Sequence, residues 1–106
     1  MKIYGLGSCD TCRKARKALP EAEFIDVRED LVPKEILLRA WQEFGPTLLN
    51  TRSKTWRSLS ESDRAGVPLD LIADHPLLMK RPLIERDGTY YLGWTREVQE
   101  ALGLAQ

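Results

Sequence analysis

The 106-residue sequence has no excess of charge of either sign, no long apolar run, and only two cysteines and one histidine. Sixteen Lys and Arg balance sixteen Asp and Glu, so the formal net charge is zero. Without an overall electrostatic field, we expect direct binding neither to nucleic acid nor to an anionic membrane. No apolar run approaches the roughly 20 residues that span a bilayer, and the N-terminus lacks signal-peptide features. We therefore expect a cytoplasmic protein, and its length indicates a single domain over residues 1–106.

The only two cysteines, Cys9 and Cys12, are separated by two residues. Structural disulfides are rare in the cytoplasm, so this spacing favours redox chemistry. The alternatives are two buried apolar cysteines or half of a zinc site. Zinc prefers four ligands and His75 is the only histidine, so a zinc site requires a second chain to supply the rest. We expect no bound metal.

The first 27 residues predict a compact βαβ unit. Lys2–Leu6 and Glu23–Val27 are predicted strands, and the helix between them runs from Asp10 or Thr11 to Leu19, where Pro20 ends it. Two strands joined through a helix in this way are parallel.

The rest of the chain predicts helices followed by a hairpin. A helix begins near Pro33 and is closed by Gly45-Pro46, and no strand signal follows between Thr47 and Pro76. Asp87-Gly88 predicts a hairpin, and Thr95 can cap a last helix. The fold class is therefore α/β: a thioredoxin (glutaredoxin-like) fold with a central four-stranded mixed sheet. An all-helical insertion at about residues 33–76 separates its βαβ and ββα halves.

The two cysteines differ in their expected environments. Cys9 lies just before the helix, where unpaired backbone N–H groups and the helix dipole stabilise a thiolate. Cys12 lies one turn inside, on the face shared with Ala15 and Leu19, so we expect it to be the more buried sulfur. This predicts that Cys9 attacks a disulfide and that Cys12 resolves the mixed disulfide.

Three segments carry a resemblance to a known family: Tyr4–Leu19 with Gly-Ser-Cys-Asp-Thr-Cys-Arg-Lys-Ala, Leu48–Leu59 with Leu-Leu-Asn-Thr-Arg-Ser-Lys-Thr-Trp, and His75–Leu83 with His-Pro-Leu-Leu-Met-Lys-Arg-Pro-Leu. The chain resembles the arsenate reductase (ArsC) family, which includes Spx regulators and YffB-type proteins. The resemblance implies a thioredoxin fold with a helical insertion, and it places Cys9 at the catalytic cysteine. It also implies that Arg81 lies close to that sulfur and that Pro82 is a cis-proline beside it.

The sequence departs from the arginine set with which the glutathione-linked reductases hold arsenate. Asn50 and Trp94 occupy positions where such reductases carry arginine. Arg52 follows two residues after the first of these, and Cys12 and the Asn-Thr-Arg-Ser-Lys segment are closer to Spx and YffB-type members. We expect Asn50, Arg52 and Pro82 to contact substrate; the alternatives are a turn formed by Asn50 and a solvated or salt-bridged Arg52.

These observations favour a thiol–disulfide oxidoreductase with Cys9 as nucleophile, Cys12 as resolving thiol and Arg81 as electrostatic support. The expected partner is glutathione or a protein thiol or disulfide. No cofactor is expected to be bound, and glutathione would act as a co-substrate. One alternative is a Spx-like redox-sensing regulator that binds RNA polymerase. Another is a glutathione- or glutaredoxin-dependent arsenate reductase.

Overall fold

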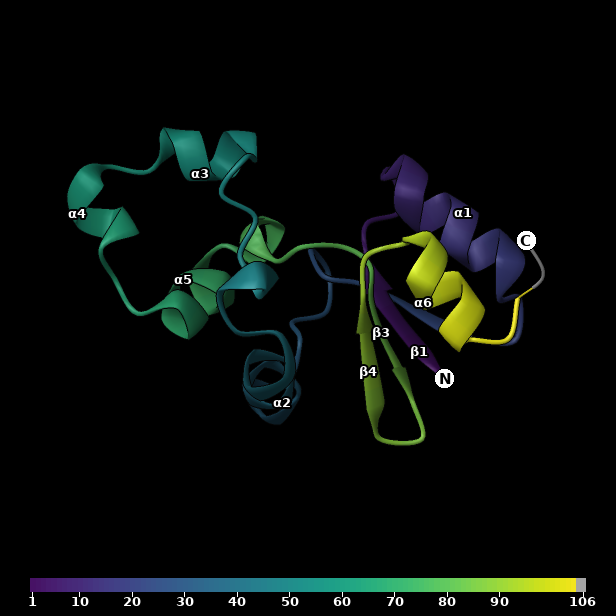
Figure 1. Cartoon of the computed structure of the whole chain (residues 1–106). Coiled ribbons are helices and arrows are strands. Elements are labelled where there is room, and N and C mark those ends of the chain that lie inside the picture. Colours follow the sequence, from purple (N-terminus) through teal and green to yellow (C-terminus); the bar gives the residue numbers. More distant parts are fainter. Residues whose placement is uncertain (105–106) are drawn as a thin grey trace. The chain divides into compact units, whose positions relative to one another are not determined.

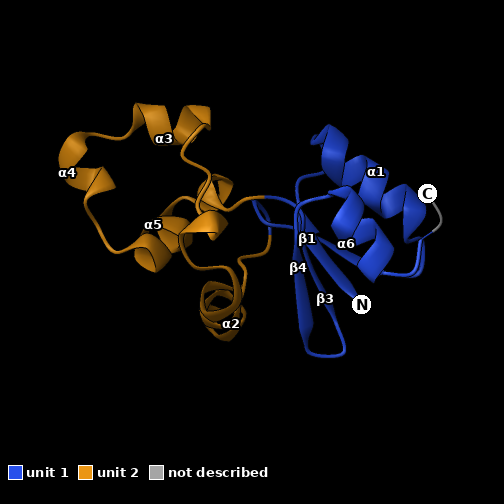
Figure 2. Ribbon diagram, in the orientation of Figure 1, with its two compact units in different colours: residues 1–29, 81–106 blue, residues 30–80 orange. Residues whose placement is uncertain are grey.

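The computed structural model describes residues 1–104, and the chain divides into two compact units (Figure 2). The first unit joins residues 1–29 to the C-terminal part that begins at Arg81; the second is residues 30–80. The predicted insertion at about 33–76 lies inside the second unit. Over residues 1–104, no helix has both the length and the apolar character needed to cross a membrane.

The first unit is built on a four-stranded sheet in the order β2-β1-β3-β4 (Figure 1). The strands are β1 (Lys2–Gly5), β2 (Glu23–Asp26), β3 (Leu83–Arg86) and β4 (Thr89–Leu92). Strand β1 pairs in parallel with β2 and antiparallel with β3, which pairs antiparallel with β4. The predicted mixed α/β sheet is confirmed.

Helices α1 (Asp10–Ala18) and α6 (Arg96–Ala101) pack against one face of this sheet. Cross-strand pairing aligns Ile3 of β1 with Ile84 of β3 on that face. Both side chains are fully buried, in one cluster with Ala15 and Leu19 of the first helix and Leu102 after the last. This core determines which face of α1 points inward. Cys12 lies on that same face, and it is buried.

The turn between β3 and β4 has the backbone that an Asp-Gly hairpin predicts. Asp87 and Gly88 both have positive φ, 51° and 82°, as a type I′ turn requires. The Gly88 N–H donates to a carboxylate oxygen of Glu85 at 2.9 Å. Thr95 caps α6 as predicted, because its hydroxyl accepts the Val98 N–H at 3.2 Å.

The second unit is mostly helical. It contains α2 (Lys34–Phe44), α3 (Lys54–Ser58), α4 (Glu61–Arg64) and α5 (Pro68–Asp74), with short 3₁₀ turns at Gly45–Leu48 and Pro76–Leu78. Ser53 and Ser60 cap α3 and α4 by accepting N–H groups three residues on. The unit departs from the all-helical prediction at one point, an isolated antiparallel bridge between Leu49 and Met79.

Candidate active site

Cys9 is the N-cap residue of α1. Its backbone is extended, with φ −83° and ψ 125°, and its carbonyl accepts the first helical hydrogen bond, from the Arg13 N–H at 2.9 Å. A preceding turn is closed by the Cys9 N–H, which donates to the Leu6 carbonyl at 3.1 Å. We call this segment, residues 6–9, the cysteine turn. It holds a partly exposed Cys9 where the unpaired N–H groups of the helix gather.

The surroundings of Cys9 favour its thiolate. Partial burial alone would raise the pKa of Cys9, but hydrogen bonds and charge outweigh it. The nearby backbone N–H groups of Cys12 and Thr11 and the Cys12 thiol lower the pKa of Cys9, and the Arg81 guanidinium adds positive charge. The net effect is a Cys9 pKa below its ordinary value, so this sulfur is the more nucleophilic of the two at neutral pH.

Cys12 has the opposite environment. Its side chain is fully buried, and burial raises its pKa to about 11, helped by the neighbouring Cys9 thiolate that accepts its S–H. A backbone N–H from Leu6 also faces the Cys12 sulfur, without offsetting the burial. Both cysteines are free thiols in this structure. One sulfur is therefore partly exposed with a lowered pKa, and its neighbour is a buried thiol with a raised pKa.

Gly5 makes the space in which the Cys12 sulfur lies. A Cβ added at Gly5 would stand 2.5 Å from Cys12 Sγ and 3.3 Å from its Cβ. Such an approach is far inside van der Waals contact, so only glycine leaves room for the buried thiol at this point of β1.

Arg81 and Pro82 precede β3 in the same unit as the cysteines. The peptide bond between them is cis, as the resemblance implies, and Pro82 is buried. The Arg81 guanidinium is close enough to both sulfurs to lower their pKa values. The structure therefore brings Cys9, Cys12 and Arg81 into one electrostatic environment.

Asn50 and Arg52 belong to the second unit. The Asn50 side-chain oxygen accepts the backbone N–H of Arg52 at 3.1 Å. The backbone N–H of Asn50 donates to the Leu78 carbonyl at 2.7 Å. Asn50 thus forms the turn that its residue type permits. Arg52, exposed, lies with Asn50 and Lys80 along an open depression of 570 Å³. Two cationic side chains border this depression.

Sequence reasoning missed one polar residue of the first unit, Asp26. Its carboxylate accepts the N–H of Gly7, within the cysteine turn, at 3.1 Å. The signal was present: β1 and β2 are parallel, so their carboxyl ends share one edge of the sheet, and Asp26 ends β2 where β1 leads into Cys9.

Within residues 1–104, no group of three or more His, Cys, Asp or Glu side chains is arranged to hold a metal ion. Trp94, at a position where the resemblance implies an arginine in arsenate-binding reductases, packs against the core of the first unit. His75 is the C-cap of α5, and its N–H donates to the Leu71 carbonyl.

Comparison with known proteins identifies the family and the fold of this chain. Residues 4–102 match the model of the ArsC family. Global transcriptional regulator Spx 2 from Bacillus cereus is 28% identical over 90% of this chain and 80% of its own length. The solved structure of a YffB protein is 31% identical, covers 94% of this chain and 96% of its own, and superposes with a TM-score of 0.85. An arsenate reductase (ArsC) related protein from Brucella melitensis is 34% identical over 94% and 91% of the two chains, with a TM-score of 0.67. The chain belongs to the ArsC family and has its thioredoxin-like fold.

Proposed function

We propose that this protein is a thiol–disulfide oxidoreductase of the ArsC family that works through Cys9 and Cys12. The observation that carries the proposal is the contrast between the two sulfurs. Cys9 is partly exposed and has a lowered pKa, whereas Cys12 is buried, protonated and hydrogen-bonded to it. This contrast suits a nucleophile paired with a resolving thiol.

The reaction needs only the two thiols and a disulfide substrate. The Cys9 thiolate attacks one substrate sulfur, and the other substrate sulfur leaves as a thiolate that takes up a proton. Cys12 then loses its proton and attacks Cys9 Sγ, which releases the second substrate thiol. Two electrons pass to the substrate, and the enzyme is left with a Cys9–Cys12 disulfide. Two molecules of glutathione, which leave as glutathione disulfide, or one protein dithiol, which leaves as its own disulfide, then return the pair to the reduced state.

The direct test compares two serine variants on a mixed disulfide between glutathione and a model peptide. Cys9→Ser is expected to abolish reduction, because the attacking sulfur is missing. Cys12→Ser is expected to keep the attack but to stop at a protein–substrate mixed disulfide, which mass spectrometry detects. Unchanged turnover in the Cys9 variant would refute the proposal.

A second function, redox-controlled binding to RNA polymerase, is favoured by the similarity to Spx 2 over nine-tenths of the chain. In that case the cysteine pair is a sensor and the function resides in a protein-binding surface. A pull-down with RNA polymerase under oxidising and reducing conditions separates the two proposals. Binding that depends on the oxidation state and is lost in Cys12→Ser supports the regulator.

Arsenate reduction is the third function within the family, and two contacts weaken it. The Asn50 side chain serves a turn, and Trp94 packs on the core, so neither offers the cationic group of the arsenate-binding set. Arsenate-dependent consumption of glutathione that disappears in Arg81→Ala would support this function over the first.

A further inference from the structure

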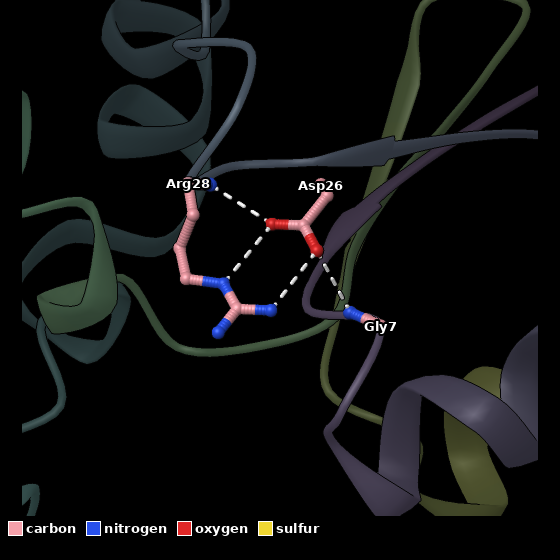
Figure 3. Close-up of polar contacts among 3 residues, drawn as sticks. All are labelled: Gly7, Asp26 and Arg28. Atoms are coloured by element: carbon pink, nitrogen blue, oxygen red, sulfur yellow. Dashed lines mark hydrogen bonds and ion pairs between the residues drawn. The ribbon is translucent and has the colours of Figure 1, made fainter.

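The carboxylate of Asp26 connects the end of β2 to the cysteine turn (Figure 3). One of its oxygens accepts the Gly7 N–H at 3.1 Å, and the other accepts the Arg28 N–H at 2.9 Å. The Asp26 side chain is 15% exposed. Each oxygen therefore has a backbone donor, one from each of the two segments that leave the parallel strands.

Gly7, whose N–H the Asp26 carboxylate accepts, lies inside the cysteine turn, close to both cysteines in the chain. The backbone N–H of the preceding residue, Leu6, acts to lower the pKa of Cys12, and the Leu6 carbonyl accepts the N–H of Cys9 at 3.1 Å. The residue that ends the turn is Cys9 itself. A contact with the Gly7 amide thus restrains a segment of four residues that reaches both sulfurs.

The Arg28 side chain holds the Asp26 carboxylate in this orientation. Its Nε lies 3.5 Å from one carboxylate oxygen and its Nη2 lies 3.4 Å from the other (Figure 3). The backbone and guanidinium donors of Arg28, together with the Gly7 amide, lower the pKa of Asp26 to about 2, so the group is ionised at neutral pH. An ionised carboxylate with a guanidinium beside it makes the stronger class of hydrogen bond to the turn.

We propose that Asp26 is a positioning residue for the redox pair, holding the cysteine turn through the Gly7 amide so that Cys9 stays at the N-terminus of α1. The proposal rests on the proposed thiol chemistry of Cys9. Asp26 acts through the turn and does not touch the reacting sulfur. Arg28 supports it by fixing the carboxylate.

The sign of the effect on Cys9 separates positioning from simple charge. Removing a nearby negative charge would by itself stabilise a thiolate and speed its alkylation at neutral pH. Releasing the turn would instead move Cys9 away from the N–H groups of Thr11 and Cys12, which favour the thiolate. The two causes predict changes of opposite sign in Cys9 reactivity.

The experiment measures the rate at which iodoacetamide alkylates Cys9 across a pH range, in the full chain. Asp26→Ala removes both acceptor oxygens, and Asp26→Asn leaves only one. We expect alkylation at neutral pH to slow by about threefold to tenfold in Asp26→Ala and by less in Asp26→Asn, because the thiolate fraction falls. Arg28→Gln is expected to slow it in the same direction and serves if an Asp26 variant does not fold.

Two matched controls complete the design. Asp10→Asn removes a negative charge next to Cys9, together with its ion pair to Arg13, and leaves the hydrogen bond between Asp26 and Gly7 in place, so it is expected to speed alkylation. Glu23→Gln changes an exposed carboxylate at the other end of β2 and should leave the rate unchanged. Faster alkylation in Asp26→Ala, as in the charge control, overturns the proposal, and so does an unchanged rate accompanied only by a lower melting temperature. Alkylation requires no turnover, so this result is independent of whether Cys9→Ser abolishes disulfide reduction.

Discussion

The resolving step is expected to be slower at neutral pH than it would be with an ordinary thiol, because Cys12 is held as a buried thiol. At pH 7 a thiol with a pKa of about 11 is ionised to about one part in ten thousand, against about one part in a hundred at the ordinary value of 9.0. The thiolate of higher pKa is the stronger nucleophile, and a Brønsted slope of about 0.4–0.5 returns about sixfold to tenfold over two pKa units. The net penalty on resolution is therefore about tenfold to sixteenfold.

Formation of the mixed disulfide reduces this penalty somewhat. Cys9 then carries no charge, so its contribution to the raised pKa of Cys12 disappears. Burial is the largest cause and persists, because it comes from the packing of Cys12 against Gly5 and its neighbours. This penalty of about tenfold to sixteenfold is thus an upper bound on the slowing of the resolving step, and burial determines its direction.

A chromogenic aromatic disulfide in a stopped-flow instrument resolves the two steps. The attack of Cys9 releases one equivalent of coloured thiolate in a fast phase, and resolution by Cys12 releases a second equivalent in a slow phase. Below the pKa of Cys12, the slow rate should rise by about tenfold per pH unit, whereas the fast rate levels off at lower pH because the pKa of Cys9 is lowered. Cys12→Ser should show the fast phase alone. Release of both equivalents in one phase at pH 7, or a slow phase that is insensitive to pH, would show that Cys12 is not held protonated as its burial implies.

Three further changes test other parts of the site. Arg81→Gln removes positive charge beside Cys9, so the pKa of Cys9 should rise and the fast phase should slow by about threefold at neutral pH. Arg81→Lys should retain most of the rate. An equal loss of rate in both variants would indicate that Arg81 acts through packing instead of charge. Gly5→Ala places a methyl group 2.5 Å from Cys12 Sγ and should lower the free energy of unfolding by about 1–3 kcal/mol in urea denaturation. The same variant should change the rate of the slow phase far more than that of the fast phase. Equal changes in both rates would argue against the inference that Gly5 makes the space for the Cys12 sulfur. Asp26 has a folded pKa of about 2, below its ordinary 3.8, so it contributes stability that is present above pH 3.8 and is lost as the pH falls through about 2. Asp26→Asn should therefore lower the free energy of unfolding by about 1 kcal/mol at pH 7; the effect is small because the partner guanidinium is half exposed and screened by solvent. This difference between the variant and the original protein should shrink in acid. A difference that grows as the pH falls would contradict the stabilising role of the ionised carboxylate.

The local features of the site were predictable from the sequence because they depend on residues close together in the chain. The helical period places Cys12 on the face of Ala15 and Leu19, and the structure buries all three in the first unit. The position of Cys9 before the helix likewise follows from where the apolar period begins, and Cys9 is indeed the N-cap. Element ends differ by one residue, as at Ala18, where α1 stops one residue before Leu19.

The parallel pairing of the first two strands indicates which end of the sheet Asp26 lies at, but the individual contacts around the sulfurs depend on a register between distant segments that the sequence does not give. Gly5 opposes Asp26 in the parallel pair, and this register brings the Asp26 carboxylate to Gly7, nineteen residues away. The closeness of Gly5 to Cys12 Sγ likewise requires α1 to pack on the sheet at a particular depth. The sequence allows Asn50 either to contact substrate or to form a turn. In the structure its side-chain oxygen accepts the backbone N–H of Arg52, so it forms the turn.

The chain has no net charge, yet it favours a thiolate at one sulfur, and the source of that preference determines how it can be altered. Backbone N–H groups at the start of α1 and the Cys12 thiol contribute more than the Arg81 charge, although burial alone acts against them. Dipoles fixed to a helix terminus act at hydrogen-bonding distance and do not depend on the surface charges of the protein. Two of the four basic residues on α1 fit this view: Arg13 pairs with Asp10, and Arg16 Cζ lies 4.1 Å from the centroid of the Phe24 ring. The reactivity of Cys9 therefore depends mainly on the geometry of the turn and the helix terminus, which is why a carboxylate that anchors the turn matters more than another cation on the helix.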